Sequence, residues 1–368
     1  MTRYLKNLDK VEIIRRGAKP MNKALRNITA GLSAILVGAL GSAVGSAAAN
    51  AQTMESFYKD KTVKVIVGFS SGGGYSKYCF QLLRSLPKYV PGSPTLVCQF
   101  MKGGGGVKAA NYMANAGPRD GSVIGMLSDY MSVAQLLRPK KIKYDARKFT
   151  YIGVMVPANP VLMAWHTAKV KSLDDLMKMQ LLVGLTGKLA QGGINASIMN
   201  AFIGTKIKPI VGYSGTSKIA ISMEAGEVEG SISSWVSWKS RAQAWIKDKK
   251  ITPIIQVGLT KAKDLPNVPL MLDYAKNDED RKVLQLISGG GPFGRSLIAP
   301  PGMAKYQIDG WRKAFDMTMA DPKFRAEAKR RNIEIDPTSG ADIQPIVAKI
   351  LATPQNIVKR AQKAIGVK

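Results

Sequence analysis

The order of apolar and polar residues near the start of the chain follows one arrangement twice. An apolar run at residues 63–69 precedes Ser-Ser-Gly-Gly-Gly at residues 70–74, and a helix-like segment follows. A second apolar run at residues 95–101 precedes four glycines at residues 103–106, and again a helix-like segment follows. Each arrangement predicts a strand, a tight glycine turn and a helix whose apolar residues face the sheet.

A third apolar run, at residues 123–127, leads into Ser128, Asp129 and Tyr130. Strands that alternate with helices predict a parallel sheet joined by right-handed crossovers. Ligands bind such sheets beyond the carboxyl ends of the strands. Both glycine turns and residues 128–130 are expected at those ends.

A second α/β block is expected to begin near Val161. Its predicted strands are followed by glycine or by small hydroxyl residues, and they lie at residues 181–185, 209–213, 230–234 and 251–259. A helix carrying Trp238 and Trp245 is predicted between the last two. The remainder, from Leu265, is predicted to be largely helical and to pack on the first block. The pattern therefore predicts an α/β protein of two lobes, each a mostly parallel sheet flanked by helices.

The two glycine turns are candidate anion sites. A glycine turn that feeds a helix leaves backbone N–H groups unpaired, and the helix dipole adds partial positive charge there. Two such turns on neighbouring strands would hold the two oxygens of one carboxylate. The alternative is a pair of tight turns without a ligand. A nucleotide is disfavoured, because no Gly-Lys-Ser/Thr closes either turn and Lys108 stands where a dinucleotide fingerprint needs its last glycine.

The first 51 residues have the pattern of an export signal. Basic residues come first, an Ala/Gly-rich apolar stretch covers residues 28–49, and Ala49-Asn50-Ala51 has the small-x-small form that signal peptidase cleaves. We expect cleavage after Ala51 and a periplasmic mature protein, with Met21 as an alternative start. An uncleaved membrane anchor is the alternative reading, since the stretch is long enough to span a bilayer.

Charge and the rare residue types narrow the classes of function. The formal net charge is +29, and about +23 remains after the eight Lys/Arg and two Asp/Glu of the first 51 residues are removed. Such a field attracts anions. Binding to an anionic membrane surface, or a basic surface without a specific role, would also account for the charge. Nucleic acid is disfavoured because no aromatic-studded basic stripe is present.

The two cysteines, Cys79 and Cys98, are expected in the first helix and the second strand. They either form a disulfide or remain as two buried thiols. His166 is the one histidine, so neither a zinc site nor a His-based triad is expected, and no cofactor is predicted. No G-x-S-x-G elbow occurs, and Asp129 is the main carboxylate expected near the cleft.

Several short segments, in order along most of the chain, resemble one family of transport receptors. They are residues 65–75, 103–106 with 109–111, 118–121, 212–215, 224–230, 265–269 and 299–302. Between about Phe57 and Val358 the chain resembles the periplasmic solute-binding receptors of tripartite tricarboxylate transporters, the Bug or TctC family. The resemblance implies a type II periplasmic binding fold that closes on a small carboxylate, held by the first two loops, and docks on a membrane permease without catalysis.

The resemblance and the residue pattern together define a candidate site and a domain division. One wall is predicted from Ser70, Ser71, Gly72, Gly73, Gly74, Tyr75, Ser76, Gly103, Gly104, Gly105, Gly106, Ser128, Asp129 and Tyr130. The other wall is predicted from Thr186, Gly187, Tyr213, Ser214 and Ser234. The first lobe is expected to comprise residues 52–157 and 259–368, and the second residues 158–258. No metal ligand is expected.

Two departures and two alternatives accompany this interpretation. The family usually has Asp where this chain has Ser76, and a related subgroup often has Arg where Phe80 stands. Loss of the aspartate removes a negative charge and an acceptor for amino groups, which favours a simple mono-, di- or tricarboxylate over amino acid or nicotinate-like ligands. A monomeric receptor is expected. The alternative function is a sensor that binds the same ligand and signals to a membrane kinase. A secreted enzyme is the second rival, with Asp129 as its best candidate base.

Overall fold

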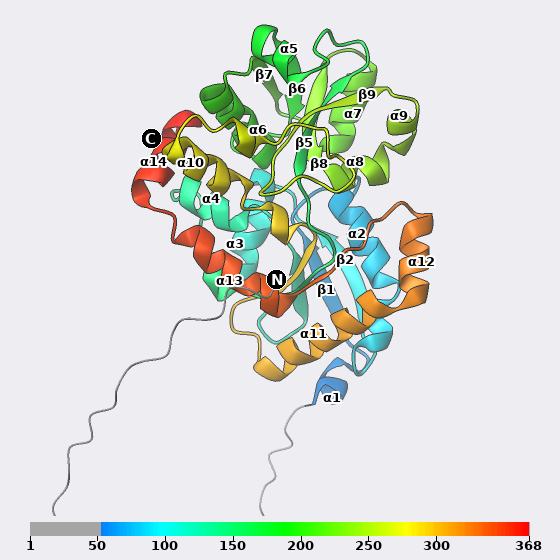
Figure 1. Ribbon diagram of the computed structural model, residues 1–368. Coiled ribbons are helices and arrows are strands. Elements are labelled where there is room, and N and C mark those ends of the chain that lie inside the picture. Colours follow the sequence, from blue (N-terminus) through cyan, green and yellow to red (C-terminus); the bar gives the residue numbers. More distant parts are fainter. Residues whose placement is uncertain (1–52, 368) are drawn as a thin grey trace, which may run out of the picture. The chain divides into compact units, whose positions relative to one another are not determined.

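The computed structural model describes residues 53–367, and these form two β-sheets with flanking helices (Figure 1). The predicted export signal, residues 1–51, lies outside the described residues. Within the described residues, no helix combines the length and the apolar character needed to cross a membrane.

The first sheet has six strands in the order β11-β4-β10-β3-β1-β2. The strands are β1 (Thr62–Val67), β2 (Thr95–Phe100), β3 (Val123–Met126), β4 (Thr150–Val154), β10 (Ser296–Ala299) and β11 (Thr338–Ser339). β1 runs parallel to β2 and β3, as predicted, so the two glycine loops leave neighbouring strands. We call this sheet and its helices the six-stranded lobe.

The second sheet has five strands in the order β7-β6-β8-β5-β9. The strands are β5 (Pro160–Trp165), β6 (Leu181–Leu185), β7 (Ile207–Val211), β8 (Gly230–Ser234) and β9 (Ile251–Gln256). We call this sheet and its helices the five-stranded lobe. The fold class is confirmed as α/β with two lobes, and the predicted lobe limits near residues 157 and 258 stay a prediction.

Both sheets are mixed rather than mostly parallel, which corrects the sequence prediction. In the six-stranded sheet β10 is antiparallel to β3 and β4, and β11 is antiparallel to β4. In the five-stranded sheet β5 is antiparallel to β8 and β9. The cause is the connection between the lobes: the chain leaves after β4 and returns before β10, so the leaving and returning strands run in opposite directions side by side.

Helices flank both sheets (Figure 1). The helices are α1 (Met54–Tyr58), α2 (Gly74–Leu83), α3 (Val107–Asn115), α4 (Met131–Leu137), α5 (Leu173–Lys178), α6 (Gln191–Ile198), α7 (Thr216–Glu224), α8 (Trp235–Arg241), α9 (Gln243–Lys247), α10 (Asp278–Ser288), α11 (Lys305–Ala320), α12 (Pro322–Arg330), α13 (Gly340–Leu351) and α14 (Gln355–Ala364). The single helix predicted around Trp238 and Trp245 is divided at Ala242 into α8 and α9, because Ala242 leaves the helical conformation.

The core explains why β1 is apolar almost throughout. Val63, Val65 and Val67 face the buried cluster that holds Trp311 of α11. Ile66 faces the opposite side of the sheet, in the cluster that includes residues of α3. A strand buried on both faces needs this continuous apolar run rather than an alternating pattern.

Cys79 of α2 and Cys98 of β2 form a disulfide, which decides between the two alternatives left open by the sequence. Cys79 is fully buried, and β2 is the edge strand of its sheet. The crosslink joins the helix that follows the first glycine loop to the strand that precedes the second. It therefore ties together the two elements that carry these loops.

Candidate functional site

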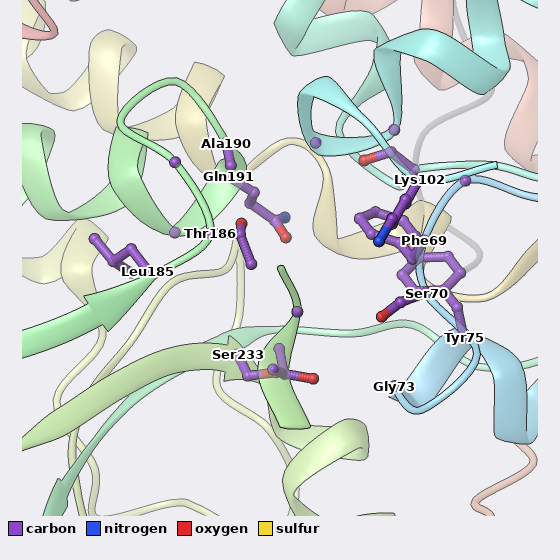
Figure 2. Close-up of a pocket in the computed structure, with 18 of the residues that line it drawn as sticks. Phe69, Ser70, Gly73, Tyr75, Lys102, Leu185, Thr186, Ala190, Gln191 and Ser233 are labelled. Atoms are coloured by element: carbon purple, nitrogen blue, oxygen red, sulfur yellow. The ribbon is translucent and has the colours of Figure 1, made fainter. Parts of the chain in front are cut away.

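A cavity of about 550 Å³ lies between the carboxyl ends of strands from the two lobes. Fifteen of the predicted site residues line it, and Figure 2 shows side chains from both walls directed toward one space. They are Ser70, Gly73, Gly74, Tyr75, Gly103, Gly104, Gly105, Gly106, Ser128, Asp129, Thr186, Gly187, Tyr213, Ser214 and Ser234.

Four predicted residues lie off this lining. Ser71 and Gly72 are exposed at the turn before α2. Ser76 is buried, and its hydroxyl donates to the carbonyl oxygen of Gly73 at 2.7 Å, so the residue that replaces the usual aspartate supports the start of α2. Tyr130 is buried at a smaller hollow beside the cavity.

Other lining residues were not predicted from the sequence. They include Phe69, Lys102, Arg138, Leu189, Ala190, Gln191, Thr216, Ser233, Ser237 and Arg295. Lys102 directly precedes the four glycines, so its position in the sequence was a usable signal. Arg138 and Arg295 carry no such signal, because they reach the cavity only through the packing of α4 and the return of the chain to β10.

The second glycine loop has a backbone that favours glycine at four successive positions. Gly103, Gly104, Gly105 and Gly106 have φ angles of 145°, 59°, 70° and 95°. L-residues rarely adopt these angles, and glycine has no such steric cost. The run of four glycines is thereby explained by a loop that turns its backbone toward the cavity before α3 begins.

Four helices of eight or more residues begin at the cavity, two from each lobe. Their N-caps are Gly73 of α2, Gly106 of α3, Ala190 of α6 and Gly215 of α7, all of which line the cavity. At none of these N-caps does the side chain accept a hydrogen bond from the first turn. The sequence predicted such an arrangement for α2 and α3, and the structure adds α6 and α7 from the opposite wall.

Among residues 53–367, charged side chains reach the cavity only from the six-stranded lobe. They are Lys102, Arg138, Arg295 and Asp129, three cations and one carboxylate. The five-stranded lobe contributes hydroxyl, amide, glycine and apolar residues to the lining. Helix N-termini that no side chain caps and an excess of cations together make the cavity suitable for an anion.

Arg295 and Asp129 form a buried pair in the cavity wall. Nη1 of Arg295 lies 3.8 Å from Oδ2 of Asp129, and each side chain is 2% exposed. Nη2 of Arg295 donates to the hydroxyl oxygens of Ser234 and Ser237 across the lobe boundary, at 2.5 Å and 2.7 Å. Burial raises the pKa of Asp129 to about 6, although Arg295 acts in the opposite direction. The separation is longer than a hydrogen bond, so the pairing offsets only part of the desolvation.

An aromatic pair forms the wall beside these charges. The rings of Phe69 and Tyr75 are stacked at 4.3 Å, and the guanidinium of Arg295 lies 4.1 Å from the centre of the Tyr75 ring. The Tyr75 hydroxyl accepts from the backbone N–H of Asp129 at 3.0 Å. The hydrogen bond ties the backbone at Asp129 to Tyr75, and the aromatic pair gives the cavity an apolar surface next to the glycine loops.

Comparison with known proteins identifies the family. The sequence pattern of the TctC family, described as "Tripartite tricarboxylate transporter family receptor", matches residues 92–363. The chain belongs to this receptor family. A Cupriavidus necator protein, "UPF0065 protein in gbd 5'region", is 23% identical over 309 residues, which are 81% of this chain and 86% of the relative.

Solved structures share the fold of this receptor. Rpa4515 of R. palustris, solved with adipate, has a TM-score of 0.64 at 18% identity and covers 83% of this chain and 98% of its own. The periplasmic binding protein BugD has a TM-score of 0.64 at 20% identity, and the match covers 84% of this chain and 99% of BugD. MatC from Rhodopseudomonas palustris, solved with malate, has a TM-score of 0.61 at 18% identity, and the match covers 83% of this chain and 99% of MatC.

Hydrogen bonds across the lobe boundary join the two lobes of the receptor in this structure. The Ser217 hydroxyl of α7 donates to the carbonyl oxygen of Gly72 at 2.9 Å. The Gln243 and Asn332 side-chain amides pair with each other on another part of the boundary. Contacts of this kind are made only when the lobes are close together, so the structure has the lobes in contact around the cavity.

Metal-binding side chains are not grouped in the described residues. No cluster of three or more His, Cys, Asp or Glu suited to a metal ion occurs between residues 53 and 367. Asp129, the carboxylate singled out as a candidate base, has Arg295 as its charged neighbour.

Proposed function

We propose that this receptor captures a small organic carboxylate in the cavity between its lobes. One observation carries the proposal: four helices without side-chain N-caps begin around a single cavity, and three cationic side chains line the same space. The carboxylate lies against the backbone N–H groups of the two glycine loops, near Lys102. The opposite wall offers uncharged donors from Thr186, Gln191 and Ser233 to the rest of the ligand.

The proposal includes the location and the partner. Cleavage after Ala51 delivers the receptor to the periplasm, where it acts as a monomer and passes its ligand to the permease subunits of a tripartite tricarboxylate transporter. Binding leaves the ligand chemically unchanged. Family membership supports the transport role, and the adipate and malate in the structures of Rpa4515 and MatC support a carboxylate as the ligand.

A thermal-shift screen against organic acids at low salt tests the proposal. A ligand that binds only the folded state raises the melting temperature by mass action. We expect a rise with malate, adipate or a related carboxylate, no rise with the corresponding amide, and unchanged ligand on recovery. A flat response to every acid in the panel would reject a carboxylate as the ligand, and turnover of the ligand would reject the receptor role.

A further inference from the structure

Arg138 connects the second glycine loop to the opposite lobe. This residue follows α4, and its Nη1 donates to the carbonyl oxygen of Gly104 at 3.0 Å and to that of Leu189 at 2.9 Å. Gly104 lies in the glycine loop, whereas Leu189 precedes α6 of the five-stranded lobe. One guanidinium nitrogen therefore spans the boundary between the lobes at the edge of the cavity.

The charge of Arg138 has no counter-ion in the part of the chain that the structure describes. Its only partners among residues 53–367 are the two carbonyl oxygens, and its Nε is buried without an acceptor. Burial lowers the pKa of this guanidinium. Arg295, the fully buried arginine of the cavity, differs because Asp129 lies beside it. Burial of part of a cation without a neighbouring anion costs free energy. An anion that enters the same space offsets this cost, so its binding there is favoured.

The side chain has donors left for such an anion. Arg138 lines the cavity, and Nη1 alone makes the contacts to Gly104 and Leu189, so Nη2 donates to none of the described residues. A carboxylate oxygen that accepts from Nη2 leaves both carbonyl contacts in place. Charge-assisted bonds of this kind are stronger than bonds between neutral groups.

We propose that the carboxylate of the ligand is the counter-ion of Arg138, and that Arg138 thereby couples anion binding to closure of the lobes. The inference rests on the proposed function. The contact with Leu189 requires the lobes to be close, and the bound anion adds an interaction to that arrangement, so the closed population rises when the ligand is charged. A neutral analogue leaves the charge of Arg138 uncompensated and is discriminated against.

The test compares Arg138→Met with Lys140→Met, which removes the same charge from an exposed position two residues away. The probe is whichever of malate and adipate binds the purified wild-type protein more tightly, together with its amide. Calorimetry gives Kd, stopped-flow fluorescence gives koff, and small-angle X-ray scattering gives the change in radius of gyration on binding. We expect Arg138→Met to raise Kd by about tenfold to hundredfold, mostly through koff. Lys140→Met should change Kd less than threefold.

The results expected for the variants separate this inference from a structural role and from failure of the proposed function. In Arg138→Met the preference for the carboxylate over the amide should fall, and ligand-induced compaction should diminish, whereas a merely structural residue would leave the preference unchanged. Arg138→Lys keeps the charge but not the contacts that join Gly104 to Leu189, so it should retain the preference for the carboxylate while losing compaction. This variant tests the inference if Arg138→Met does not fold.

Equal Kd and koff in wild type and Arg138→Met would overturn the inference. Absence of carboxylate binding to wild type would overturn the proposed function itself.

Discussion

Gly74, in the first turn of α2, lies so close to Ser237 of α8 that a Cβ atom on Gly74 would be 2.0 Å from the Ser237 hydroxyl oxygen. The two residues belong to different lobes. A second pair repeats the relationship in the other direction, because a Cβ on Gly215 would be 2.6 Å from the hydroxyl oxygen of Ser70. Glycines at the cavity therefore do more than present N–H groups, since they also allow the two lobes to approach each other.

Gly74→Ala should weaken ligand binding by holding the lobes apart. The φ angle of Gly74 is not in the left-handed region, and alanine suits the start of a helix, so the substitution should not lower the free energy of unfolding. We expect Kd for the carboxylate to rise at least tenfold and compaction on binding to be lost. Calorimetry and small-angle scattering measure these changes.

A second-site change tests the cause of that effect. Ser237→Gly removes the side chain that the new methyl group would meet, so Gly74→Ala/Ser237→Gly should recover part of the lost affinity. Recovery will be incomplete, because Ser237 also accepts from Arg295. If the double variant bound no better than Gly74→Ala alone, steric separation of the lobes would not explain the loss.

Gly105→Asp should weaken binding of the carboxylate through charge repulsion. The φ angle of Gly105 is 70°, which Asp and Asn tolerate better than other L-residues. Gly105→Asn is therefore the matched control, since it has the same shape and nearly the same backbone cost without the carboxylate. We expect the Asp variant to bind at least tenfold more weakly than the Asn variant at low salt, and the gap to narrow as salt is added. Equal affinities of the two variants would show that the second glycine loop does not contact the bound anion.

The strands and loops that build one wall could be predicted because their signals are local. The run from Val63 to Val67 lies within one strand, and the glycines at 103–106 and the residues 128–130 each follow the end of another. All three segments are contiguous in sequence. The short strands β10 and β11 were not predicted, because four and two residues are too few for a periodic pattern. They join the six-stranded sheet only after the chain has passed through the other lobe.

The charged side chains of the cavity were predicted less completely than its backbone. Asp129 follows a predicted strand directly, so it was found. Arg138 and Arg295 are separated from the second glycine loop by about 30 and 190 residues, and only tertiary packing brings them to the cavity. The helix N-termini of α6 and α7 were also not predicted as anion sites, because no local pattern in the chain places them opposite the first two loops.

The disulfide should contribute strongly to stability. Cys79 and Cys98 enclose a short loop with a sequence separation of 19, and crosslinks of this size reduce the entropy of the unfolded chain by an amount worth about 3 kcal/mol. Cys79→Ala/Cys98→Ala should lower the free energy of unfolding by about that amount in urea titrations. Alanine is preferred to serine because Cys79 is fully buried and a hydroxyl there would lack a partner.

Reduction of the wild-type protein provides the control for the disulfide. A reductant added to the unfolding experiment should lower the stability of wild type toward that of the double variant and leave the variant unchanged. If the wild-type and double-variant proteins unfolded at the same urea concentration without reductant, the crosslink would not stabilise the fold.

Ligand affinity should rise as pH falls from 8 to about 5.5. Burial raises the pKa of Asp129 from 3.8 to about 6, so this side chain is charged above pH 6 and largely neutral below it. A negative Asp129 in the cavity wall repels the ligand anion, and protonation removes that repulsion while the carboxylate of the ligand stays ionised. Calorimetry in buffers of different ionisation enthalpy should detect proton uptake on binding near pH 6.5.

The same group should make the ligand-free receptor less stable as pH rises from about 4 to 6. The pKa of Asp129 is higher in the folded state than in the unfolded state, so the folded state binds the proton more tightly. This difference stabilises the folded state at low pH, and the stabilisation is lost as pH rises from the unfolded pKa to the folded pKa. The shift of Asp129 corresponds to about 3 kcal/mol. Asp129→Asn should make both the affinity and this part of the stability profile independent of pH. A pH dependence that persisted unchanged in Asp129→Asn would assign the titration to another group.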